Sequence, residues 1–348
     1  MLVSVIIPVF NGAATVAAAI DSALAQKFDG EFEVIVVNDG STDSTAEVLR
    51  GYGDRIKVVT QENRGAAAAR NACVRNSSGQ YLAFLDADDE WREDKLAKTV
   101  AALDAHAEAG MVYTDATLID ESGKVVAANY IPDTHAREPS FDELLREWWY
   151  VLPSTVVMRR SILDRCGGFE ERFGRCRYGE DAYIWLLARE IAPFRLIPSP
   201  LVRYRVATVR EHHAKREAAR GGSDPAPGEQ ADPHRYVHGE LVFERLLRER
   251  YGRRAKPLIR RARASQASLL ESIGLSAMAR SEAALARRCY LVSIQRKPLR
   301  TRIWMRFVWA LMPRRVRRVI LALLPLHLAR AVEGPPYDPL EERQTSPA

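Results

Sequence analysis

The most informative segment of this chain is YLAFLDADD, residues 81–89. A short apolar run rich in β-forming residues predicts a buried strand of a parallel sheet. The run ends in Asp86, Asp88 and Asp89, which would lie at the sheet edge where open α/β folds bind ligands. Clustered carboxylates repel one another unless a cation neutralises them, and Mg²⁺ and Mn²⁺ prefer oxygen ligands. The segment therefore predicts either a divalent-cation site or an acidic turn, because D-x-D is a short and common pattern.

Around this segment, apolar runs alternate with helical patterns through the first half of the chain. Such alternation is typical of an α/β fold with a mostly parallel sheet and helices on both faces. Right-handed crossovers would place the loops after Val9, Asn38 and Leu85 on one edge of the sheet. The expected strands are residues 2–9, 33–38, 57–60, 80–86 and 110–114, and the expected helices are residues 14–26, 44–50, 65–75 and 94–107.

The pattern weakens after residue 115 and then changes in character. The sequence predicts short helices at 141–149, 160–166 and 181–190, and short strands at 154–158, 196–197 and 201–206. Residues 211–235 predict a flexible linker or loop, because much of that segment is rich in Gly, Pro and Ala. Residues 236–330 are helical in pattern, and residues 331–348 are expected to form a disordered tail.

Length and composition limit the class of protein. A chain of 348 residues exceeds a typical single domain, which predicts two domains or one domain with an extension. The four cysteines fit neither a zinc site nor a disulfide scaffold, so we expect reduced thiols and a cytoplasmic location. The first eight residues predict a strand rather than a signal peptide. The sequence contains no run of about 18 uncharged apolar residues, so we expect no transmembrane helix.

The net charge of +6 hides an asymmetry along the chain. Residues 245–330 hold 22 Lys/Arg against 3 Asp/Glu, a local charge of +19 that leaves −13 for the remainder. Within this region, residues 303–312 and 319–326 are short apolar segments on either side of an arginine cluster. Such a basic amphipathic extension favours docking on an anionic membrane surface. The alternatives are packing on the rest of the chain or on a second subunit, and nucleic-acid binding, which no recognisable module supports.

Four segments together carry a family resemblance: Ser4–Asn11, Val36–Asp43, Gln61–Asn71 and Leu85–Asp89. In this order and spacing they resemble the nucleotide-sugar-binding half of glycosyltransferase family 2, the inverting enzymes with a GT-A fold. The resemblance is close over residues 3–115 and looser to about residue 206. It implies a Rossmann-like GT-A domain at residues 1–210, in which residues 1–115 bind the nucleotide sugar and residues 116–210 form the acceptor side.

The resemblance also implies a set of donor-binding residues. Asp39 follows a strand, where its carboxylate can accept a hydrogen bond from the imide N–H of uracil, although a turn or capping role is the alternative. Arg70 can meet a base or a phosphate, or remain a solvated helix arginine. Pro8, Val9 and Phe10 are expected to contact the base, with core packing as the alternative for Val9.

The same resemblance assigns the cofactor to the D-x-D element. Asp88 is expected to bind Mn²⁺ or Mg²⁺ and through it the diphosphate, while Asp86 faces the ribose and is the second candidate ligand. Asp89 is ranked third, because the segment offers three acids. The ion would neutralise the charge that develops on the departing diphosphate.

A second carboxylate pair, Glu180-Asp181, resembles the E-D motif of the family. Asp181 is the expected general base, and Glu180 would position Asp181 or the acceptor. The alternative is helix capping, since acids at a helix start satisfy free N–H groups. Residues 203–206 and the histidines His212 and His213 match the family loosely, and we expect a strand edge with surface histidines there.

These observations predict an inverting, metal-dependent hexosyl- or N-acetylhexosaminyltransferase. The donor is expected to be a UDP-sugar and the acceptor a sugar or lipid-linked hydroxyl, in cell-surface polysaccharide or glycolipid synthesis. The chain would sit peripherally at the cytoplasmic face of the membrane, with oligomer formation open and no nucleic-acid partner. The alternatives are a nucleotide-sugar-binding interaction protein without turnover, a membrane-binding protein that acts through its tail, and a nucleotidyltransferase.

Overall fold

The computed structural model describes residues 2–147, 150–176, 179–206, 233–262, 283–296 and 301–313. The chain divides into two compact units, one of residues 1–212 and 230–262 and the other of residues 213–229 and 263–348. The expected linker up to residue 232, the tail at 331–348, the two histidines at 212 and 213, and Trp148 and Trp149 lie outside the described residues.

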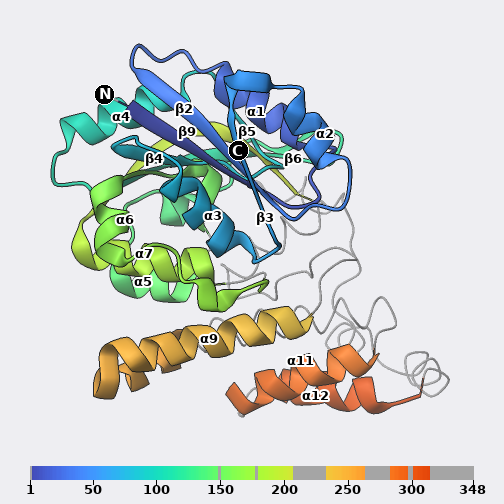
Figure 1. The fold of residues 1–348 in the computed structure, drawn as a ribbon. Helices are drawn as coiled ribbons and strands as arrows, with labels where there is room; N and C mark the ends of the chain where they lie inside the picture. Colours follow the sequence, from blue (N-terminus) through green and yellow to red (C-terminus); the bar gives the residue numbers. More distant parts are fainter. Residues whose placement is uncertain are drawn as a thin grey trace, which may run out of the picture. The chain divides into compact units, whose positions relative to one another are not determined.

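The first unit is built on a sheet whose first four strands are parallel, in the order β3-β2-β1-β4 (Figure 1). These strands are β1 (Leu2–Val9), β2 (Glu31–Asp39), β3 (Lys57–Gln61) and β4 (Tyr81–Phe84). The apolar side chains of β1, β2 and β4 are mostly buried, as expected for strands covered on both faces, whereas Val58 on the edge strand β3 is 41% exposed. The sequence predicted all four strands, although β4 ends two residues before Asp86.

The sheet continues past β4 in the order β8-β6-β9-β5, with β7 paired to β6. These strands are β5 (Glu90–Trp91), β6 (Met111–Ile119), β7 (Val125–Ala127), β8 (Val157–Arg159) and β9 (Phe194–Arg205). β6 runs parallel to β9, while β8 is antiparallel to both β4 and β6. The two strands expected at 196–197 and 201–206 are one continuous strand, whose pairing shifts register opposite Asp115. The interruption in the apolar pattern therefore marks a bulge, not a strand end.

Helices cover both faces of the sheet, so the expected α/β class with the GT-A type of architecture is confirmed (Figure 1). Figure 1 shows α1, α2 and α4 on one side of the strands and α3, α6 and α7 on the other. The helices are α1 (Val16–Leu24), α2 (Thr45–Arg50), α3 (Ala66–Arg75), α4 (Lys95–Ala105), α5 (Phe141–Glu147), α6 (Arg160–Cys166) and α7 (Glu180–Ile191). Short 3-10 turns lie at Gly53–Arg55, Asp133–His135, Pro153–Thr155, Glu171–Phe173 and Gly252–Arg254.

An aromatic cluster joins the two halves of this unit beneath the sheet edge. Phe84 at the end of β4 packs edge-to-face on Phe169 and Trp185, with ring centroids 5.5 and 6.2 Å away. Trp185 lies on α7 and is fully buried. Because Trp185 follows Asp181 by one helical turn, this packing sets the position of the start of α7.

Helix α9 (Pro233–Tyr251) belongs to the same compact unit, although the sequence grouped residues 236–330 as one extension. Its Phe243 ring packs 5.9 Å from Tyr183 of α7. Glu190 at the end of α7 accepts hydrogen bonds from Arg250 at 2.8 Å and from the Tyr251 hydroxyl at 2.7 Å. Helix α9, the first helix of the basic region, therefore packs on α7 and holds its C-terminal end.

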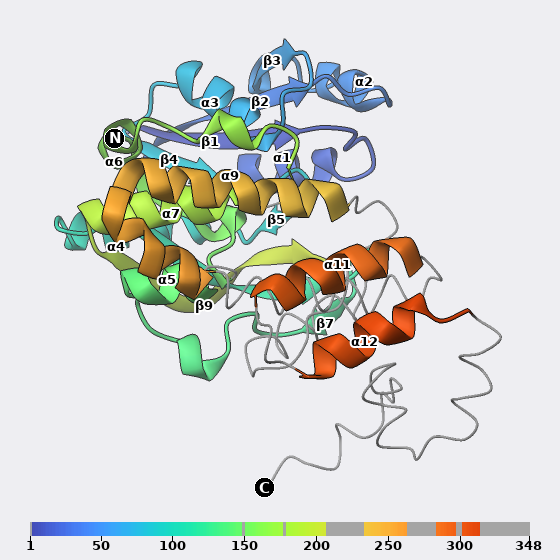
Figure 2. The ribbon, with the colours of Figure 1, turned by 90° about the horizontal axis from the view of Figure 1, so that it is seen from below.

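The second unit contains α11 (Ala283–Arg296) and α12 (Thr301–Leu311), which lie side by side in Figure 2. Their shared core is formed by Ala286, Tyr290, Ile294, Ile303 and Ala310. Within the described part of the chain, no helix is both long enough and apolar enough to cross a bilayer.

Candidate active site

The loops that follow β1 and β2 are joined by hydrogen bonds at the carboxyl edge of the sheet. Asn11 donates its N–H to Ser41 Oγ at 2.9 Å, and its Oδ1 accepts from Thr42 N–H at 2.8 Å. The N–H of Gly12 donates to Thr45 Oγ1 at 3.0 Å. Asn11 adopts a left-handed φ of 52°, which asparagine tolerates better than most residues. The predicted convergence of these loops is thus built from side-chain to backbone contacts.

The three residues at the end of β1 differ in exposure. The pairing of β1 with β4 ends at Ile6, before Pro8. Because proline has no N–H, its place beyond this pairing costs no hydrogen bond between β1 and β4. Val9 is buried in the core, whereas Phe10 is 50% exposed at the sheet edge. Phe10 is therefore available to stack on a base, and Val9 can contribute through its backbone.

Asp39 is held in place by three donors. Its Oδ1 accepts from Gln61 Nε2 at 2.7 Å and from Arg64 N–H at 2.9 Å, and its Oδ2 accepts from Gly65 N–H at 2.8 Å. The residue is 3% exposed. The carboxylate thus holds Arg64 and Gly65, the two residues that precede α3, and caps neither α2 nor α3. A carboxylate has about four lone-pair sites, so one stays available for an imide N–H.

Arg70 joins the loop after β4 to the start of α7. Its Nη2 donates to Asp86 Oδ1 at 2.8 Å, and its Nη1 donates to Glu180 Oε1 at 3.1 Å. The guanidinium lies 5.6 Å from the centroid of the Phe169 ring and is nearly fully buried. A solvated helix arginine is therefore excluded; direct contact with a base or phosphate stays a prediction.

The three acids after β4 have three different surroundings. Asp88 is exposed, and Asp86 keeps about a quarter of its side chain exposed beside Arg70. Asp89 is fully buried; its carboxylate accepts from Ser154 Oγ and, at 2.9 Å, from the N–H of Arg205. Burial, reinforced by the charges of Asp88 and Asp86, raises the pKa of Asp89 well above its ordinary value. Asp89 therefore anchors the loop, while Asp86 and Asp88 are left as candidate ligands.

The residues present fit a divalent ion that arrives with a diphosphate. Among the described residues, no group of three or more His, Cys, Asp or Glu side chains is placed to hold a metal. Mg²⁺ is commonly bound by one or two carboxylates together with substrate phosphates. Asp88 and the second oxygen of Asp86 match that donor set, which suits a substrate-associated ion better than a permanent protein cage.

Ser154 and Arg205, to which the sequence assigned no role, hold the acidic loop. Ser154 accepts the N–H of Asp86 at 3.0 Å and donates to Asp89, and its carbonyl accepts from Trp91 Nε1 at 2.8 Å. Arg205 on β9 donates from Nε to the carbonyl of Asp88 at 2.9 Å. The loose match at residues 203–206 pointed toward Arg205, but a lone buried serine carries no recognisable pattern.

The acid pair stands at the first turn of α7. Glu180 pairs with Arg70, and Asp181 Oδ1 accepts the N–H of Ala182 at 2.7 Å. Burial and the neighbouring Glu180 charge raise the pKa of Asp181 to about 7, against a smaller opposing effect of Arg70. A carboxylate with a pKa near 7 is suited to general-base catalysis at neutral pH.

The segment before α7 is fastened to the start of α3. Arg64 Nη2 pairs with Glu171 at 2.7 Å, and Asn71 Nδ2 donates to the Phe169 carbonyl at 2.8 Å. Gly65 has a φ of +91°, and a Cβ there would stand 1.8 Å from the Gly174 carbonyl oxygen. Only glycine permits this close approach, which brings the segment before α7 against the start of α3.

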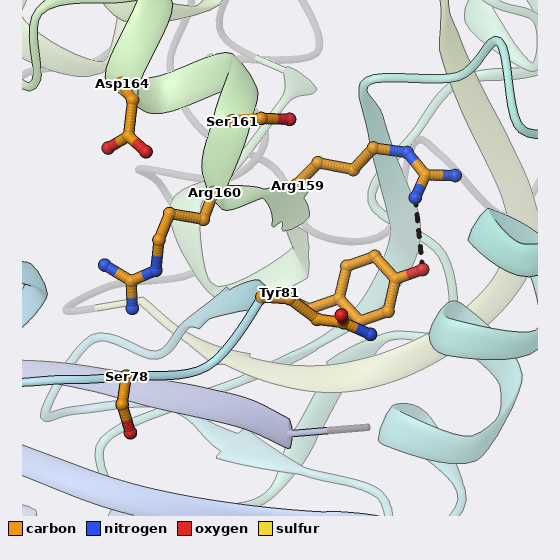
Figure 3. Close-up of a pocket in the computed structure, with 7 residues that line it drawn as sticks. Ser78, Tyr81, Arg159, Arg160, Ser161 and Asp164 are labelled. Carbon is orange, nitrogen blue, oxygen red and sulfur yellow. Dashed lines mark hydrogen bonds between the residues drawn. The ribbon is translucent and has the colours of Figure 1, made fainter.

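The opposite edge of the sheet carries a pocket of about 480 Å³ at the start of β4 (Figure 3). Figure 3 shows Arg159 and Arg160 extending from the start of α6 on either side of it. Arg159 donates to Tyr81 and to the carbonyls of Leu103 and Ala109. Arg160 donates to the Gly79 carbonyl at 2.6 Å. These arginines are used to hold backbone segments, so the pocket is not part of the candidate site.

Comparisons with known proteins agree with this geometry. The family described as glycosyl transferase family 2 matches residues 4–167. A glucosyltransferase from Escherichia coli, UDP-Glc:alpha-D-GlcNAc-diphosphoundecaprenol beta-1,3-glucosyltransferase WfgD, is 33% identical over 190 residues, covering 53% of this chain and 68% of that protein. The chain belongs to glycosyltransferase family 2. Membership confirms the resemblance carried by the four donor-half segments.

Other family 2 relatives extend the comparison. An uncharacterized glycosyltransferase from Rickettsia prowazekii is 31% identical over 208 residues, covering 59% of this chain and 64% of that protein. A second, from Rickettsia felis, is 42% identical over 212 residues but is covered over only 34% of its length. The chain thus spans between about a third and two thirds of these relatives.

A solved structure supports the fold. A fragment of S. aureus TarS in complex with UDP-GlcNAc superposes with a TM-score of 0.52 at 16% identity, covering 87% of this chain and 90% of that one. At this level of identity the likeness concerns the fold alone.

Proposed function

We propose that this family 2 protein is an inverting, metal-dependent glycosyltransferase that moves a hexosyl or N-acetylhexosaminyl group from a UDP-sugar to a hydroxyl acceptor. The observation that carries the proposal is the double ion pair of Arg70 with Asp86 and Glu180. It brings the acidic loop after β4 within electrostatic range of Asp181, the only site acid whose pKa is raised to about 7 among the described residues.

Each site residue then has a role consistent with its surroundings. Asp39, oriented by three donors, would accept the imide N–H of uracil, while Phe10 stacks on the base. Asp86 would hold the ribose, and Asp88, with Asp86, would hold Mg²⁺ or Mn²⁺. The ion, when bound, supplies positive charge that stabilises the diphosphate leaving group.

The acceptor step rests on Asp181. Its carboxylate would take the proton from the acceptor hydroxyl as that oxygen attacks the anomeric carbon on the face opposite the leaving group, and one displacement inverts the configuration. Glu180 and Arg70 orient the start of α7 during this step.

The names of the relatives support the choice of donor and acceptor class. WfgD is named for a UDP-glucose donor and a diphosphoundecaprenol-linked acceptor, and TarS was solved with UDP and with UDP-GlcNAc. A relative from Bacillus subtilis, TuaG, is named for teichuronic acid biosynthesis. We therefore propose a lipid-linked or sugar acceptor in cell-surface polysaccharide or glycolipid synthesis, at the cytoplasmic face of the membrane.

A donor-hydrolysis screen tests the proposal. The full chain is incubated with a panel of UDP-, TDP- and GDP-sugars, with Mn²⁺ or with EDTA, and nucleotide release is measured. We expect metal-dependent UDP release from at least one donor and its loss in Asp88→Ala. Asp54→Ala, an exposed aspartate in a 3-10 turn, is the matched control and should retain activity.

Three outcomes would contradict parts of the proposal. Donor binding without release from any sugar would favour the interaction protein without turnover. Equal release in EDTA would remove the metal dependence. Release of pyrophosphate from a nucleoside triphosphate and a sugar phosphate would favour a nucleotidyltransferase.

A further inference from the structure

Helix α12 in the second unit has two faces of opposite environment. Its inner face packs on α11, where Ile303 and Ala310 meet Ala286 and Tyr290 in a shared apolar core. The guanidinium of Arg287 on α11 also donates to the carbonyl of Ala310 at 3.3 Å. The orientation of α12 on α11 is therefore fixed by packing.

The outer face of α12 is apolar and exposed. Trp304, Val308 and Leu311 follow one another at helical spacing, and Met305 lies beside Trp304. Their exposed fractions are 44, 47, 54 and 41% for Trp304, Val308, Leu311 and Met305. Four large apolar side chains on one face of an eleven-residue helix form a patch of the kind that marks an interaction surface.

The charge of the sequence that contains α12 selects the occupant. Residues 283–330 contain 12 Lys/Arg and no Asp or Glu. A second copy of the chain that docked through the same basic helix would bring the same positive charge to the contact and be repelled. An anionic phospholipid surface can bind both the positive charge and the apolar face. Basic residues are attracted to the headgroups, while Trp and aliphatic side chains enter the headgroup–acyl boundary.

We propose that the outer face of α12, defined by Trp304, Met305, Val308 and Leu311, docks on an anionic membrane surface. The patch lies parallel to the helix axis, so α12 would lie in the interface plane rather than cross the bilayer. This inference rests on the proposed function, because docking on a membrane would bring the enzyme to a lipid-linked acceptor.

Vesicle co-sedimentation of the full chain tests the docking. Vesicles of phosphatidylglycerol and phosphatidylcholine are compared with vesicles of phosphatidylcholine alone. We expect the parent chain to bind the anionic vesicles more tightly, with affinity that falls as NaCl rises. The double variant V308E/L311E should lose at least tenfold in partition coefficient. Leu241→Glu on α9, at a position 56% exposed, adds one of these two negative charges elsewhere and should bind like the parent.

The outcomes that overturn the proposal are equally defined. It fails if the parent does not bind anionic vesicles or if V308E/L311E binds them as well as the parent. It also fails if equilibrium sedimentation shows a dimer that V308E/L311E dissociates while vesicle binding is absent. Binding to an oligonucleotide in preference to the vesicles would instead favour nucleic acid as the partner of the basic region.

Measurement of UDP release on the same preparations separates this inference from the proposed function. Without vesicles, V308E/L311E should release UDP from a soluble donor at the parent rate, which also shows that the variant is folded. Vesicle binding in the expected pattern with no UDP release from any donor would overturn the enzymatic proposal and leave the docking in place. UDP release without vesicle binding would do the reverse.

Discussion

The two edges of the sheet both present arginines beside polar side chains, but they use them differently. At the amino edge, Arg159 and Arg160 donate mainly to backbone carbonyls around the pocket of Figure 3. At the carboxyl edge, Arg70 donates only to carboxylates, those of Asp86 and Glu180, among the described residues. Carbonyls hold a loop whatever the pH, whereas carboxylates can exchange partners with a cation or a substrate. We therefore interpret the pocket as structural and propose that the chemistry takes place at the carboxyl edge, where opposite charges meet.

The largest expected effect comes from Asp181→Asn at the carboxyl edge. Loss of the base should lower the rate of sugar transfer to acceptor by about 10²–10⁴-fold, the usual contribution of a general base. Nucleotide binding, measured by calorimetry with UDP and Mn²⁺, should be retained. An Asn variant that transfers sugar at the parent rate would remove Asp181 from the mechanism.

The next effect tests the ion pairs of Arg70. Arg70→Met leaves Asp86 and Glu180 uncompensated near Asp181, and breaking a buried pair in this way costs about 3–5 kcal/mol. Urea unfolding of the variant should show a loss of this order. Arg70→Lys is the control: it keeps one charge but loses the two-sided contact, so its loss should be smaller. Equal stability of Arg70→Met and parent would mean that the network does not hold the two halves together.

The pH dependence sharpens the same comparison. Because the pKa of Asp181 is raised to about 7, the rate of transfer should fall about tenfold per pH unit below pH 7. The folded-state pKa lies above the ordinary 3.8, so the protonated carboxyl stabilises the fold below about pH 4, and this contribution is lost as the pH rises toward 7. Asp181→Asn should therefore melt at a higher temperature than the parent at pH 8. A rate profile that is flat between pH 5 and 8 would contradict this assignment.

The smallest effect on activity is expected at the amino edge. Arg160→Gln removes the guanidinium contacts to Gly79, Val74 and Ser77, which should lower stability. Donor hydrolysis at a temperature well below unfolding should change less than about twofold, because Arg160 touches no proposed site residue. A large loss of activity in a variant that stays folded would make the pocket functional and reverse the comparison of the two edges.

The secondary structure of the first four strands could be predicted because each strand follows from the residues next to one another in the chain. Strands β1 to β4 are short apolar runs, and parallel pairing then obliges their carboxyl ends to share one edge. The strand-end position drew attention to Asp86 and Asp88, whereas the roles of Asp39 and Arg70 came from the family resemblance and stay predictions. The acceptor half was less predictable: β9 was divided in two, because a bulge interrupts its pattern, and β5 is too short to predict.

The local sequence identifies the acidic residues, but it does not determine how buried each one is or how its pKa is shifted. Asp86, Asp88 and Asp89 look alike in the chain, yet contacts from residues far away in sequence, Ser154 and Arg205, bury Asp89 and leave Asp88 exposed. The raised pKa of Asp181 likewise arises from burial and from neighbours assembled by α3 and α7. Strand and helix patterns follow from neighbours along the chain, whereas burial and charge pairing follow from segments brought together by folding. Burial and charge pairing are what distinguish the proposed ligand Asp88, the anchor Asp89 and the proposed base Asp181.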